Sequence, residues 1–434
     1  MPPPVSRNKF VEDAGCIECS LVPRILLLLP TTTYRTADFL AAAERLGCDV
    51  TVASEEASTL EGLNPGGLLT LDFQNVDASA RRAAEFARGM PIDAVVGADD
   101  ETVIAAAAIA RALGLSHNSA GAVEAARHKP TMRARLAEAG VPQPGFRLFR
   151  TDDDSSRAAA AVSFPCVLKP TFLAGSRGVI RANDSVEFLE AWRRIERILS
   201  EPDVMRRGKD WAREILVEDF VSGVEVALEG VLRDGELVTL ALFDKPDPLE
   251  GPFFEETLYV TPSRLPRGTQ RAVEEVAWQA AAALGLRHGP IHAELRVGRS
   301  GPQVVEIAGR SIGGLCSRAL RFGTGISLEE LILKDALGVD VTKEKRESSA
   351  AGVLMLPIPR AGRLEEVRGR EEARAVPGIE EVTISAHLGQ RLVPLPEGSR
   401  YLGFVFARAE SPQGVEDALR EAQRRLDFRI RSEG

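Results

Sequence analysis

Apolar residues in the first third of the chain recur in short blocks separated by amphipathic segments, so that strand and helix periodicities alternate. The aliphatic block before Pro30 has the continuous apolar character of a buried parallel strand. We expect strands at 24–29, 49–53 and 92–97 and helices at 36–46 and 101–113, with Thr36 as a helix cap and Gly47 as a helix end. This alternation predicts an open parallel sheet, and therefore a Rossmann-like domain over residues 24–125. No G-x-G-x-x-G sequence follows any of these strands, which argues against a dinucleotide site.

The middle of the chain changes to longer strands joined by short turns. Asp234-Gly235, between two apolar runs, is a hairpin signal. Two helix starts have the sequence of a capping box, one at Asp184 with Glu187 and one at Ser327 with Glu330. The expected strands are 164–169, 215–220, 224–233, 236–243, 290–297 and 303–307, and the expected helices are 130–139, 185–199, 269–284 and a segment ending near 337. We expect two lobes here, over residues 126–215 and 216–345.

The last part of the chain, residues 346–434, is expected to form a separate small α+β lobe with no chemical constellation. Strands are expected near 352–356, 381–385 and 402–407, and a final amphipathic helix at 414–426. Residues 1–23 have no periodicity and contain Pro2-Pro3-Pro4, so a flexible leader is expected. Cys16 and Cys19 in this leader form a C-x-x-C pair without a second pair nearby, which favours free thiols over a zinc site.

Composition excludes several classes of function. The 434 residues carry a formal net charge of -9 without any basic block, which disfavours binding to nucleic acid. No apolar run approaches the roughly 20 residues needed to cross a bilayer, so we expect a cytoplasmic protein without membrane contact. The five cysteines are scattered and odd in number, which argues against a disulfide framework. The oligomeric state is left open, with a homodimer as one option.

A pair of acidic residues is the first candidate for chemistry. His292, Glu294 and Arg296 point to one side of their strand because side chains alternate, and Glu306 follows at the end of the next strand. If the two strands pair, both carboxylates converge on one face of the sheet. Mg²⁺ is usually held by one or two carboxylates together with substrate phosphates. On spacing alone, two solvated glutamates on the strand face are an equally good interpretation.

Lysines and a glycine-bearing loop form a second candidate group. Lys169 ends an apolar strand directly before the loop 172–178, whose Gly175, Ser176, Arg177 and Gly178 can present backbone N–H groups to phosphates. Lys129 precedes a helix and, taken alone, has the pattern of a surface lysine. A third segment, 215–225, leads from an apolar strand into Glu218, Asp219 and Phe220 and then Glu225. The backbone of this segment could form hydrogen bonds with the edge of a purine, and its carboxylates could bind ribose hydroxyls. Taken singly, the same residues also fit a strand–turn–strand with polar ends.

The order of these pieces along the chain resembles the ATP-grasp superfamily over roughly residues 24–340. Lys129, with Met132 and Arg133, is similar to the first nucleotide-binding lysine of that family, and Lys169 is similar to the second. Loop 172–178 resembles the loop that covers the phosphates. The segment Glu218, Asp219 and Phe220 resembles the hinge that receives adenine, and Glu225 the acid that binds ribose.

The metal signature of the family is present with one departure. Glu294 and Glu306 match the two metal-binding acids, and Arg310 matches the arginine of the E-x-N-x-R signature. The asparagine of that signature is Ala308 here, so the number of bound metals is in doubt. The resemblance implies ATP and Mg²⁺, with Mn²⁺ as an alternative metal. It also implies a mixed α/β and α+β architecture: a pre-ATP-grasp parallel-sheet domain, two central lobes and an accessory C-terminal lobe.

Within the superfamily, the loop 243–256 and the Gly313-Gly314 segment resemble the L-amino-acid ligase and carnosine synthase-like branch. This resemblance implies a ligase that activates a small carboxylate as an acyl phosphate and passes it to an amine. Glu255 and Glu256 then become candidates for binding a substrate ammonium, and Arg318 and Arg321 for binding a carboxylate. Candidate catalytic residues are Arg310, which would stabilise an oxyanion, Lys245 and His292.

Two other functions remain open at this point. Bicarbonate-activating enzymes of the carboxylase type share the same lysines, loop and acids. A nucleotide-binding protein without ligase activity is the second alternative, and Ala308 gives it some support.

Overall fold

The computed structural model describes residues 22–433, so the predicted leader and Cys16 and Cys19 lie outside the described residues. Its first domain contains a parallel sheet of strand order β3-β2-β1-β4, as the βα pattern predicts. The elements are β1 (Arg24–Leu28), α1 (Thr36–Leu46), β2 (Asp49–Ser54), β3 (Leu68–Thr70), α2 (Val76–Phe86), β4 (Ala94–Gly97) and α3 (Val103–Leu113). Gly47 ends α1 with φ 64°, as expected. Thr36 does not cap this helix, because the N-cap is Arg35 and no side chain provides the bond.

Two helices, α4 (Ala120–Arg127) and α5 (Lys129–Glu138), lead into a small lobe. This lobe has an antiparallel sheet of order β5-β8-β6-β7, packed against α7. Its elements are β5 (Phe146–Arg150), α6 (Ser155–Ala160), β6 (Cys166–Pro170), β7 (Ile180–Ala182), α7 (Ser185–Leu199), α8 (Pro202–Gly208), the 3-10 helix η1 (Lys209–Arg213) and β8 (Glu214–Asp219). Asp184 caps α7 as predicted, but the Glu187 carboxylate accepts from the backbone of Asn183, so the predicted reciprocal bond of a capping box is not formed.

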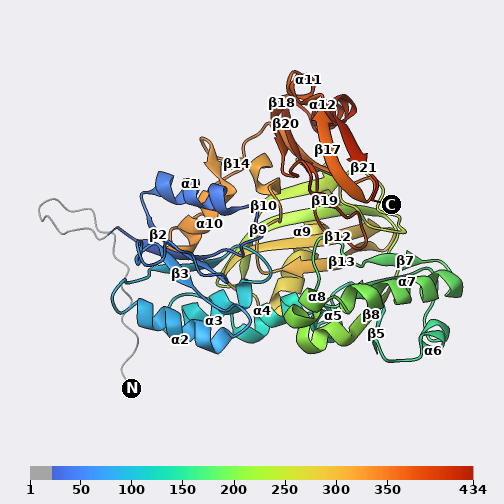
Figure 1. Cartoon of the computed structure of the whole chain (residues 1–434), viewed down its shortest axis with the longest axis horizontal. Coiled ribbons are helices and arrows are strands. Elements are labelled where there is room, and N and C mark those ends of the chain that lie inside the picture. The colour runs from blue at the N-terminus through green and yellow to red at the C-terminus, as the bar shows by residue number, and fades with distance from the viewer. Residues whose placement is uncertain (1–21, 434) are drawn as a thin grey trace, which may run out of the picture.

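An eight-stranded sheet of order β13-β12-β9-β10-β11-β16-β20-β18 forms the centre of the molecule (Figure 1). Helix α9 covers one face of its first half through an apolar core that includes Val273, Ala277 and Leu295. The bounds are β9 (Val224–Arg233), β10 (Glu236–Lys245), β11 (Leu258–Thr261), α9 (Arg267–Leu284), β12 (Gly289–Gly298), β13 (Gly301–Ala308), β16 (Ala350–Leu356), β18 (Ile379–Ile384) and β20 (Gly403–Ala409).

The prediction of a separate C-terminal lobe is wrong in one respect, because three of its strands continue the central sheet. The unpredicted strand β11 makes the junction: Leu258 pairs with Leu354 and Thr261 with Ala351. Around this half of the sheet lie α11 (Arg370–Arg374), α12 (Pro412–Arg425) and a small sheet of β17 (Gly362–Arg368), β19 (Arg391–Leu392) and β21 (Asp427–Arg431). The C-terminal segment therefore shares its backbone hydrogen bonds with the lobe that precedes it.

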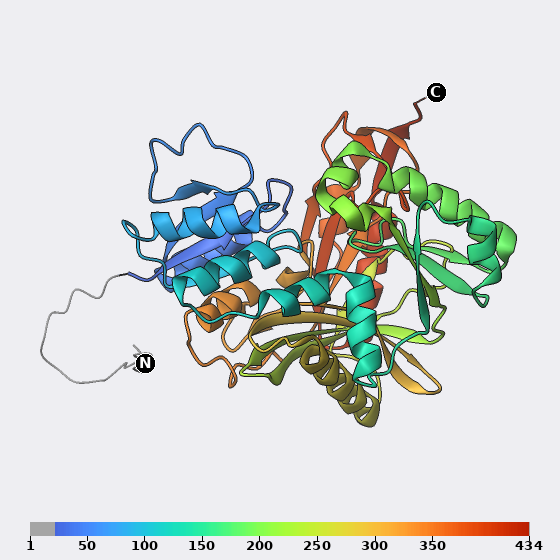
Figure 2. The same ribbon diagram turned by 90° about the horizontal axis from the view of Figure 1, so that it is seen from below.

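The segment between the two halves of the sheet returns to the first domain. It contains the 3-10 helix η2 (Cys316–Ala319), β14 (Arg321–Phe322), β15 (Ile326–Ser327) and α10 (Leu328–Ala336). The capping box of Ser327 and Glu330 is formed as predicted. Leu331 and Ile332 of α10 pack in one core with Phe39 of α1, which joins the first domain to the central sheet. Figure 2 shows the first domain and the small lobe on opposite sides of the molecule. No helix in residues 22–433 is long and apolar enough to cross a membrane.

Candidate functional site

A cavity of about 1400 Å³ lies where the first domain, the small lobe and the central sheet meet. Its walls come from the ends of β1 and β4, from the loop 172–178, from the sheet and from a loop before β20. The lining includes Thr31, Tyr34, Arg35, Asp100, Arg127, Leu173, Gly175, Ser176, Arg177, Glu256, Tyr259, His292, Glu294, Glu306, Ala308, Arg310, Ser399, Arg400 and Tyr401. The two predicted metal residues, most of the predicted loop and the predicted catalytic residues His292 and Arg310 are thus brought together from distant parts of the sequence, whereas Lys245 and Gly178 do not line this cavity.

Strand register arranges the polar residues of the sheet in three rows. In one row Ala227 of β9 lies opposite Glu294 of β12, which lies opposite Glu306 of β13. The second row runs Lys245, Glu225, Arg296, and the third runs Glu229, His292, Ala308. Glu294 and Glu306 are therefore direct cross-strand neighbours. The two-residue turn at Arg299 and Ser300 sets the register as far as Leu295 and Val304, and a β-bulge at Val305 then brings Glu306 rather than Val305 opposite Glu294.

Lys245 is the centre of a buried cluster of three carboxylates. Its Nζ lies 2.7 Å from Glu225, 2.5 Å from Glu256 and 2.9 Å from Glu294. Burial would lower the pKa of Lys245, but the three carboxylates hold it well above its usual value, so the ammonium stays charged. Burial and the neighbouring Glu294 raise the pKa of Glu256 to about 7. The carboxylate oxygens of these three acids lie close enough together to hold a cation. The Lys245 ammonium occupies that position.

His292 is held between two carboxylates. Its Nδ1 contacts Glu229 and its Nε2 lies 3.3 Å from Glu294. Burial would lower the pKa of His292, but the Glu229 carboxylate overrides this effect and raises it to about 9. A ring protonated at neutral pH is a donor that orients Glu294, and it does not suit a catalytic role as a general base.

The two candidate nucleotide lysines occupy different places. Lys129 Nζ donates to the carbonyl of Leu173, at 2.9 Å, and lies 3.3 Å from Glu306, so it connects the loop 172–178 to the acidic row. Lys169 Nζ lies 2.6 Å from Glu218, whose other oxygen accepts from Arg133 Nε at 2.6 Å. Burial would raise the pKa of Glu218, but these two cations lower it to about 2. Lys169 and Glu218 are not part of the cavity lining.

Loop 172–178 is bonded to Lys129 on one side and to the loop before β20 on the other. Gly175, Ser176 and Gly178 have φ values of 63°, 54° and 74°, in the left-handed region that the two glycines adopt without a steric penalty. Arg177 Nε donates to the carbonyl of Glu397, at 2.7 Å, and Gly178 N donates to that of Pro396, at 2.8 Å. A C-terminal loop that the sequence left without a role thus holds this one in place.

Arg310 joins the central sheet to the first domain. Its Nη2 donates to Asp100 Oδ2 at 2.8 Å. Burial would raise the pKa of Asp100, but Arg310 and Arg127 hold it well below its usual range. Sequence reasoning missed Asp100, Arg127 and Glu229. Only Glu229 carried a signal, as an acid within the otherwise apolar stretch of β9.

Several predicted residues are not brought to this cavity. Arg318 pairs with Asp38 and Glu381, and the exposed Arg321 pairs with Glu380. Glu255 is half-buried, which raises its pKa, and it does not line the cavity. The predicted substrate roles of these residues gain no support from their positions.

The predicted adenine hinge is also outside the lining. The N–H of Asp219 donates to Gly145 and that of Phe220 to Pro165, so these two groups are already bonded. The Phe220 ring lies under the guanidinium groups of Arg181, at 4.0 Å, and Arg296, at 5.0 Å.

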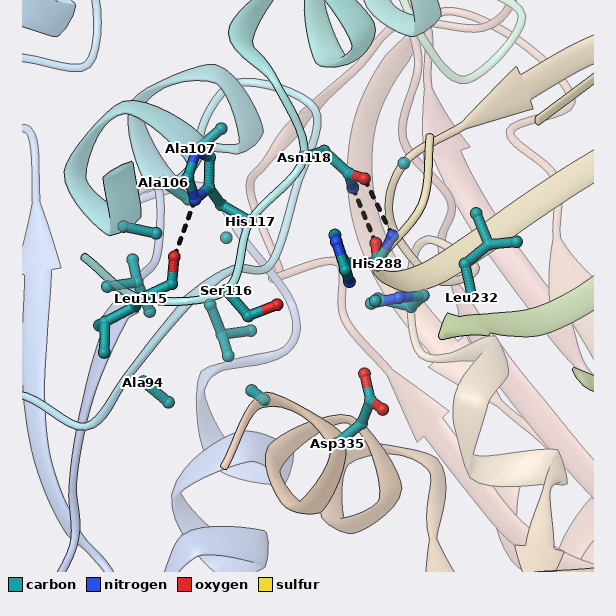
Figure 3. Close-up of a pocket in the computed structure, with 18 of the residues that line it drawn as sticks. Ala94, Ala106, Ala107, Leu115, Ser116, His117, Asn118, Leu232, His288 and Asp335 are labelled. Atoms are coloured by element: carbon teal, nitrogen blue, oxygen red, sulfur yellow. Dashed lines mark hydrogen bonds between the residues drawn. The ribbon is translucent and has the colours of Figure 1, made fainter. Parts of the chain in front are cut away.

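A smaller cavity of about 240 Å³ lies between β4, α3, the turn after β9 and the end of α10. Figure 3 shows His117, His288 and Asp335 around it, with the Asn118 side chain bonded to the backbone of His288. Burial raises the pKa of Asp335 to about 6, against a lowering effect of Arg233. Neither the predicted nucleotide residues nor the predicted metal residues line this cavity.

The donor set of the larger cavity fits a magnesium nucleotide. Glu294 and Glu306 offer carboxylate oxygens on one face of the sheet, the hard ligands that Mg²⁺ prefers. Ala308 at the neighbouring position is buried and supplies no side-chain oxygen. Lys129, Arg127 and Arg310 provide positive charge beside these acids.

Three family models match different parts of the chain. Residues 162–319 match the ATP-grasp domain, residues 40–117 match the ATP-grasp N-terminal domain, and residues 354–431 match L-amino acid ligase C-terminal domain 2. Together they cover most of the first domain, the chain from just before β6 to η2, and the C-terminal strands after the start of β16, and they leave residues 118–161 and 320–353 unmatched.

Named proteins are similar over shorter or longer parts of the chain. Human carnosine synthase 1 is 27% identical over 69% of this chain and 38% of its own length. Alanine–anticapsin ligase of Bacillus subtilis is 28% identical over 51% of this chain and 49% of its own length. The chain thus spans half or less of these two relatives. The crystal structure of an L-amino acid ligase from Bacillus licheniformis superposes with a TM-score of 0.79 at 26% identity, covering 94% of this chain and 99% of that one.

Proposed function

Since this chain is an ATP-grasp ligase related to L-amino acid ligases and carnosine synthase, we propose that it uses Mg-ATP to join a small carboxylate to an amine, with an amino acid as one of the two substrates. The product is an amide or peptide bond, and the by-products are ADP and phosphate. We expect the reaction to take place in the cytoplasm, on small molecules.

One observation carries this proposal: the cross-strand pair Glu294 and Glu306 lies between Lys129 and the Lys245 cluster in the wall of the large cavity. Acids that hold a cation, next to a lysine that reaches the phosphate-covering loop, are the groups that phosphoryl transfer needs. The likeness to L-amino acid ligases supports an amine as the acceptor.

In the first proposed step, a carboxylate oxygen of the donor substrate attacks the γ-phosphorus of ATP, and ADP leaves. Lys129, Lys169 and the backbone N–H groups of Gly175 and Ser176 hold the phosphates, and Arg310 holds the reacting carboxylate. Mg²⁺, when bound, neutralises charge on the phosphates. The chain itself supplies position and charge, since this transfer needs no nucleophile from the protein.

In the second proposed step, the amine nitrogen attacks the carbonyl carbon of the acyl phosphate, the carbon–oxygen bond to phosphate breaks, and the amine loses its proton. Arg310 stabilises the oxyanion that forms on the carbonyl oxygen. Hydrolysis of the acyl phosphate competes with this step, so water must be excluded. Loop 172–178 and the segment 244–256 are the proposed lids.

The experiment is ADP release with Mg-ATP over a matrix of carboxylates and amines, with products identified by mass spectrometry. Release that requires both a carboxylate and an amine, together with a new amide, supports the proposal. Glu306→Gln is expected to reduce the rate at least a hundredfold. Glu236→Gln, an exposed acid at the start of β10, is the matched control.

The acyl phosphate is tested separately with a carboxylate labelled with ¹⁸O. Transfer of one ¹⁸O to phosphate is expected, whereas AMP as the product contradicts the proposed intermediate. ADP release that depends on bicarbonate alone replaces the ligase with a bicarbonate-activating enzyme, and ATP binding without turnover replaces it with a binding protein.

A further inference from the structure

The 240 Å³ cavity of Figure 3 lies between the first domain and the central sheet, apart from the proposed nucleotide site. Strand β4 and helix α3 form one wall, and the end of β9, the start of β12 and the end of α10 form the other. Of the described residues, none lines both this cavity and the large one. The reaction proposed above therefore gives this space no occupant.

Asp335 brings to this cavity a buried carboxylate that lacks a hydrogen-bond donor. Its side chain is 10% exposed, and within residues 22–433 no group donates a hydrogen bond to its oxygens. Arg233 Nε lies 3.9 Å from Asp335 Oδ1, which is beyond hydrogen-bond distance. The same guanidinium donates through Nη1 to the carbonyl of Val339, at 2.8 Å, and to Asp340, at 3.3 Å. A buried carboxylate without a donor is unfavourable, so a ligand that supplies one is stabilised here.

The two histidines of the lining add acceptors to this carboxylate. His117 Nδ1 lies 2.8 Å from the Leu115 carbonyl, so the neutral ring carries its proton on Nδ1 and its Nε2 is an acceptor. Burial lowers the pKa of His288, which favours a neutral ring with one acceptor nitrogen. Figure 3 shows Asp335 pointing from α10 toward the side of the cavity that holds Ser116 and His288. A primary ammonium, with three N–H donors and no acceptor, complements such a set.

The rest of the wall is apolar and fixes the other end of the ligand. Alanine side chains of α3, among them Ala106 and Ala107, lie along it together with residues of β4. The volume exceeds the roughly 150 Å³ that holds a benzene-sized molecule in a protein core, so a small hydrocarbon body fits. A bare metal ion does not, because the only three metal-ligand side chains that converge in residues 22–433 are Glu225, Glu256 and Glu294, which do not line this cavity.

We propose that this cavity is a second ligand site, which binds a small primary amine with an aliphatic body between the first domain and the central sheet. The ammonium donates to Asp335 and to the histidine acceptors, and the aliphatic body lies against the alanines of α3. Because the ligand contacts both parts of the chain, its binding stabilises the folded arrangement in which they meet. The proposal does not depend on the ligase reaction, since none of these groups takes part in it.

The probes for the test are isopentylamine, isopentanol and isovalerate, which share one aliphatic body and differ in the charge of the head group. Isothermal titration calorimetry of the full chain near neutral pH, without ATP, measures their binding. Isopentylamine is expected to bind with a Kd on the order of 0.1 to 1 mM, and isovalerate is expected not to bind. Asp335→Asn is expected to weaken the binding of the amine roughly tenfold or more and to leave that of the alcohol unchanged, because only the amine loses a charged partner.

Asp340→Asn is the matched control, since Asp340 contacts the same Arg233 but does not line the cavity. It is expected to change the affinity for the amine by no more than about twofold, because its ion pair is exposed. Ala107→Leu fills the space and is expected to abolish the binding of both amine and alcohol, with circular dichroism to check the fold.

No binding of isopentylamine, equal binding of amine and alcohol, or unchanged binding of the amine in Asp335→Asn overturns the proposal. Binding of the amine that is lost in Glu306→Gln and kept in Asp335→Asn places the probe in the large cavity and also overturns it. A chain that forms no amide from any pair of substrates, but binds the amine through Asp335, removes the proposed function and leaves this second site standing.

Discussion

At the scale of single residues, Glu229 shows how a buried charge can support a site without lining it. It is 1% exposed, and it contacts His292 with one oxygen while the other accepts from the backbone N–H of Ile312 at 3.0 Å. The carboxylate thus holds both the ring beside Glu294 and the segment after Arg310. Removing one member of such a pair leaves an uncompensated charge in the interior.

We predict that Glu229→Gln lowers the free energy of unfolding by about 3 kcal/mol, because the protonated His292 ring loses its closest counter-charge. Urea denaturation followed by fluorescence and circular dichroism measures the effect. The exposed Glu236→Gln is expected to change stability by no more than about 0.5 kcal/mol. Equal stabilities for the two variants would contradict this account of the buried pair.

Asp335, in the last turn of α10 beside the smaller cavity, gives a pH dependence of stability. Its pKa is about 6 in the folded protein against an ordinary 3.8, because burial disfavours the charged form. The folded chain then binds this proton more tightly than the unfolded chain. Stability is therefore lost as pH rises from about 4 through about 6, by up to about 3 kcal/mol.

Asp335→Asn is expected to remove this loss and to be more stable than the wild-type chain at pH 8 but not at pH 4. Chemical denaturation at both pH values measures the difference. Asp340→Asn is the control, since Asp340 contacts the same Arg233, at 3.3 Å, but has a lowered pKa. Parallel stability profiles for the wild-type chain and Asp335→Asn would refute the assignment.

At the scale of elements, the loop before β20 (residues 394–401, the C-terminal strap) and the loop 172–178 are held together by hydrogen bonds. The loop has few apolar contacts of its own beyond Phe172 and Leu173, and its far end depends on the strap carbonyls. Arg194 anchors the strap to α7 through Glu397, with Nη2 to Oε2 at 2.9 Å. Glu397, more than 200 positions away in the sequence, thus helps to hold the proposed phosphate lid in its place.

We predict that Glu397→Ala speeds amide hydrogen exchange in residues 172–178 and raises the ratio of ADP to amide product two- to tenfold, on the order expected when a lid opens more often. Exchange followed by mass spectrometry and a coupled ADP assay measure the two effects. Asp152→Ala, which removes an exposed ion pair with Arg150 in the same lobe, is the control. Unchanged amide hydrogen exchange of residues 172–178 in Glu397→Ala would show that the strap does not hold the lid in place.

At the scale of the whole molecule, the sequence predicted the long helices and strands better than the short strand that connects the two halves of the central sheet. Periodicity located β9 and α7 at their observed bounds, because long apolar or amphipathic runs dominate there. The strand β11 was missed, since Leu258–Thr261 is only four residues long and follows a loop. That one strand decides that the C-terminal segment extends the central sheet.

The candidate site was predicted in the same uneven way. Alternation and a short turn placed Glu294 and Glu306 on paired strands, but they do not predict the β-bulge that brings Glu306 rather than Val305 opposite Glu294. Asp100, Arg127 and Arg400 come from three distant segments, and nothing in their own neighbourhoods marks them. The ion pairs of Arg318 and Arg321 depend on Asp38, Glu380 and Glu381, which only the folded chain brings near.

We predict that a chain ending at residue 345 does not give a stable monomer, although it keeps every predicted nucleotide and metal residue. It lacks β16, so β11 becomes an open edge with unpaired backbone groups. Size-exclusion chromatography and circular dichroism compare it with the full chain. A soluble, cooperatively folding fragment would show that the two halves of the sheet are independent.

The pairing of β11 with β16 also has a consequence for biosynthesis. The two strands are neighbours in the sheet, but their facing residues Leu258 and Leu354 are separated by almost a hundred positions. A ribosome adds roughly 5 to 20 residues each second, so the β11 edge waits for seconds before its partner emerges. During that interval the nascent chain exposes an unpaired strand edge that can pair with other chains. Synonymous codons that slow translation between these positions are therefore expected to reduce the yield of soluble protein, although the amino-acid sequence is unchanged.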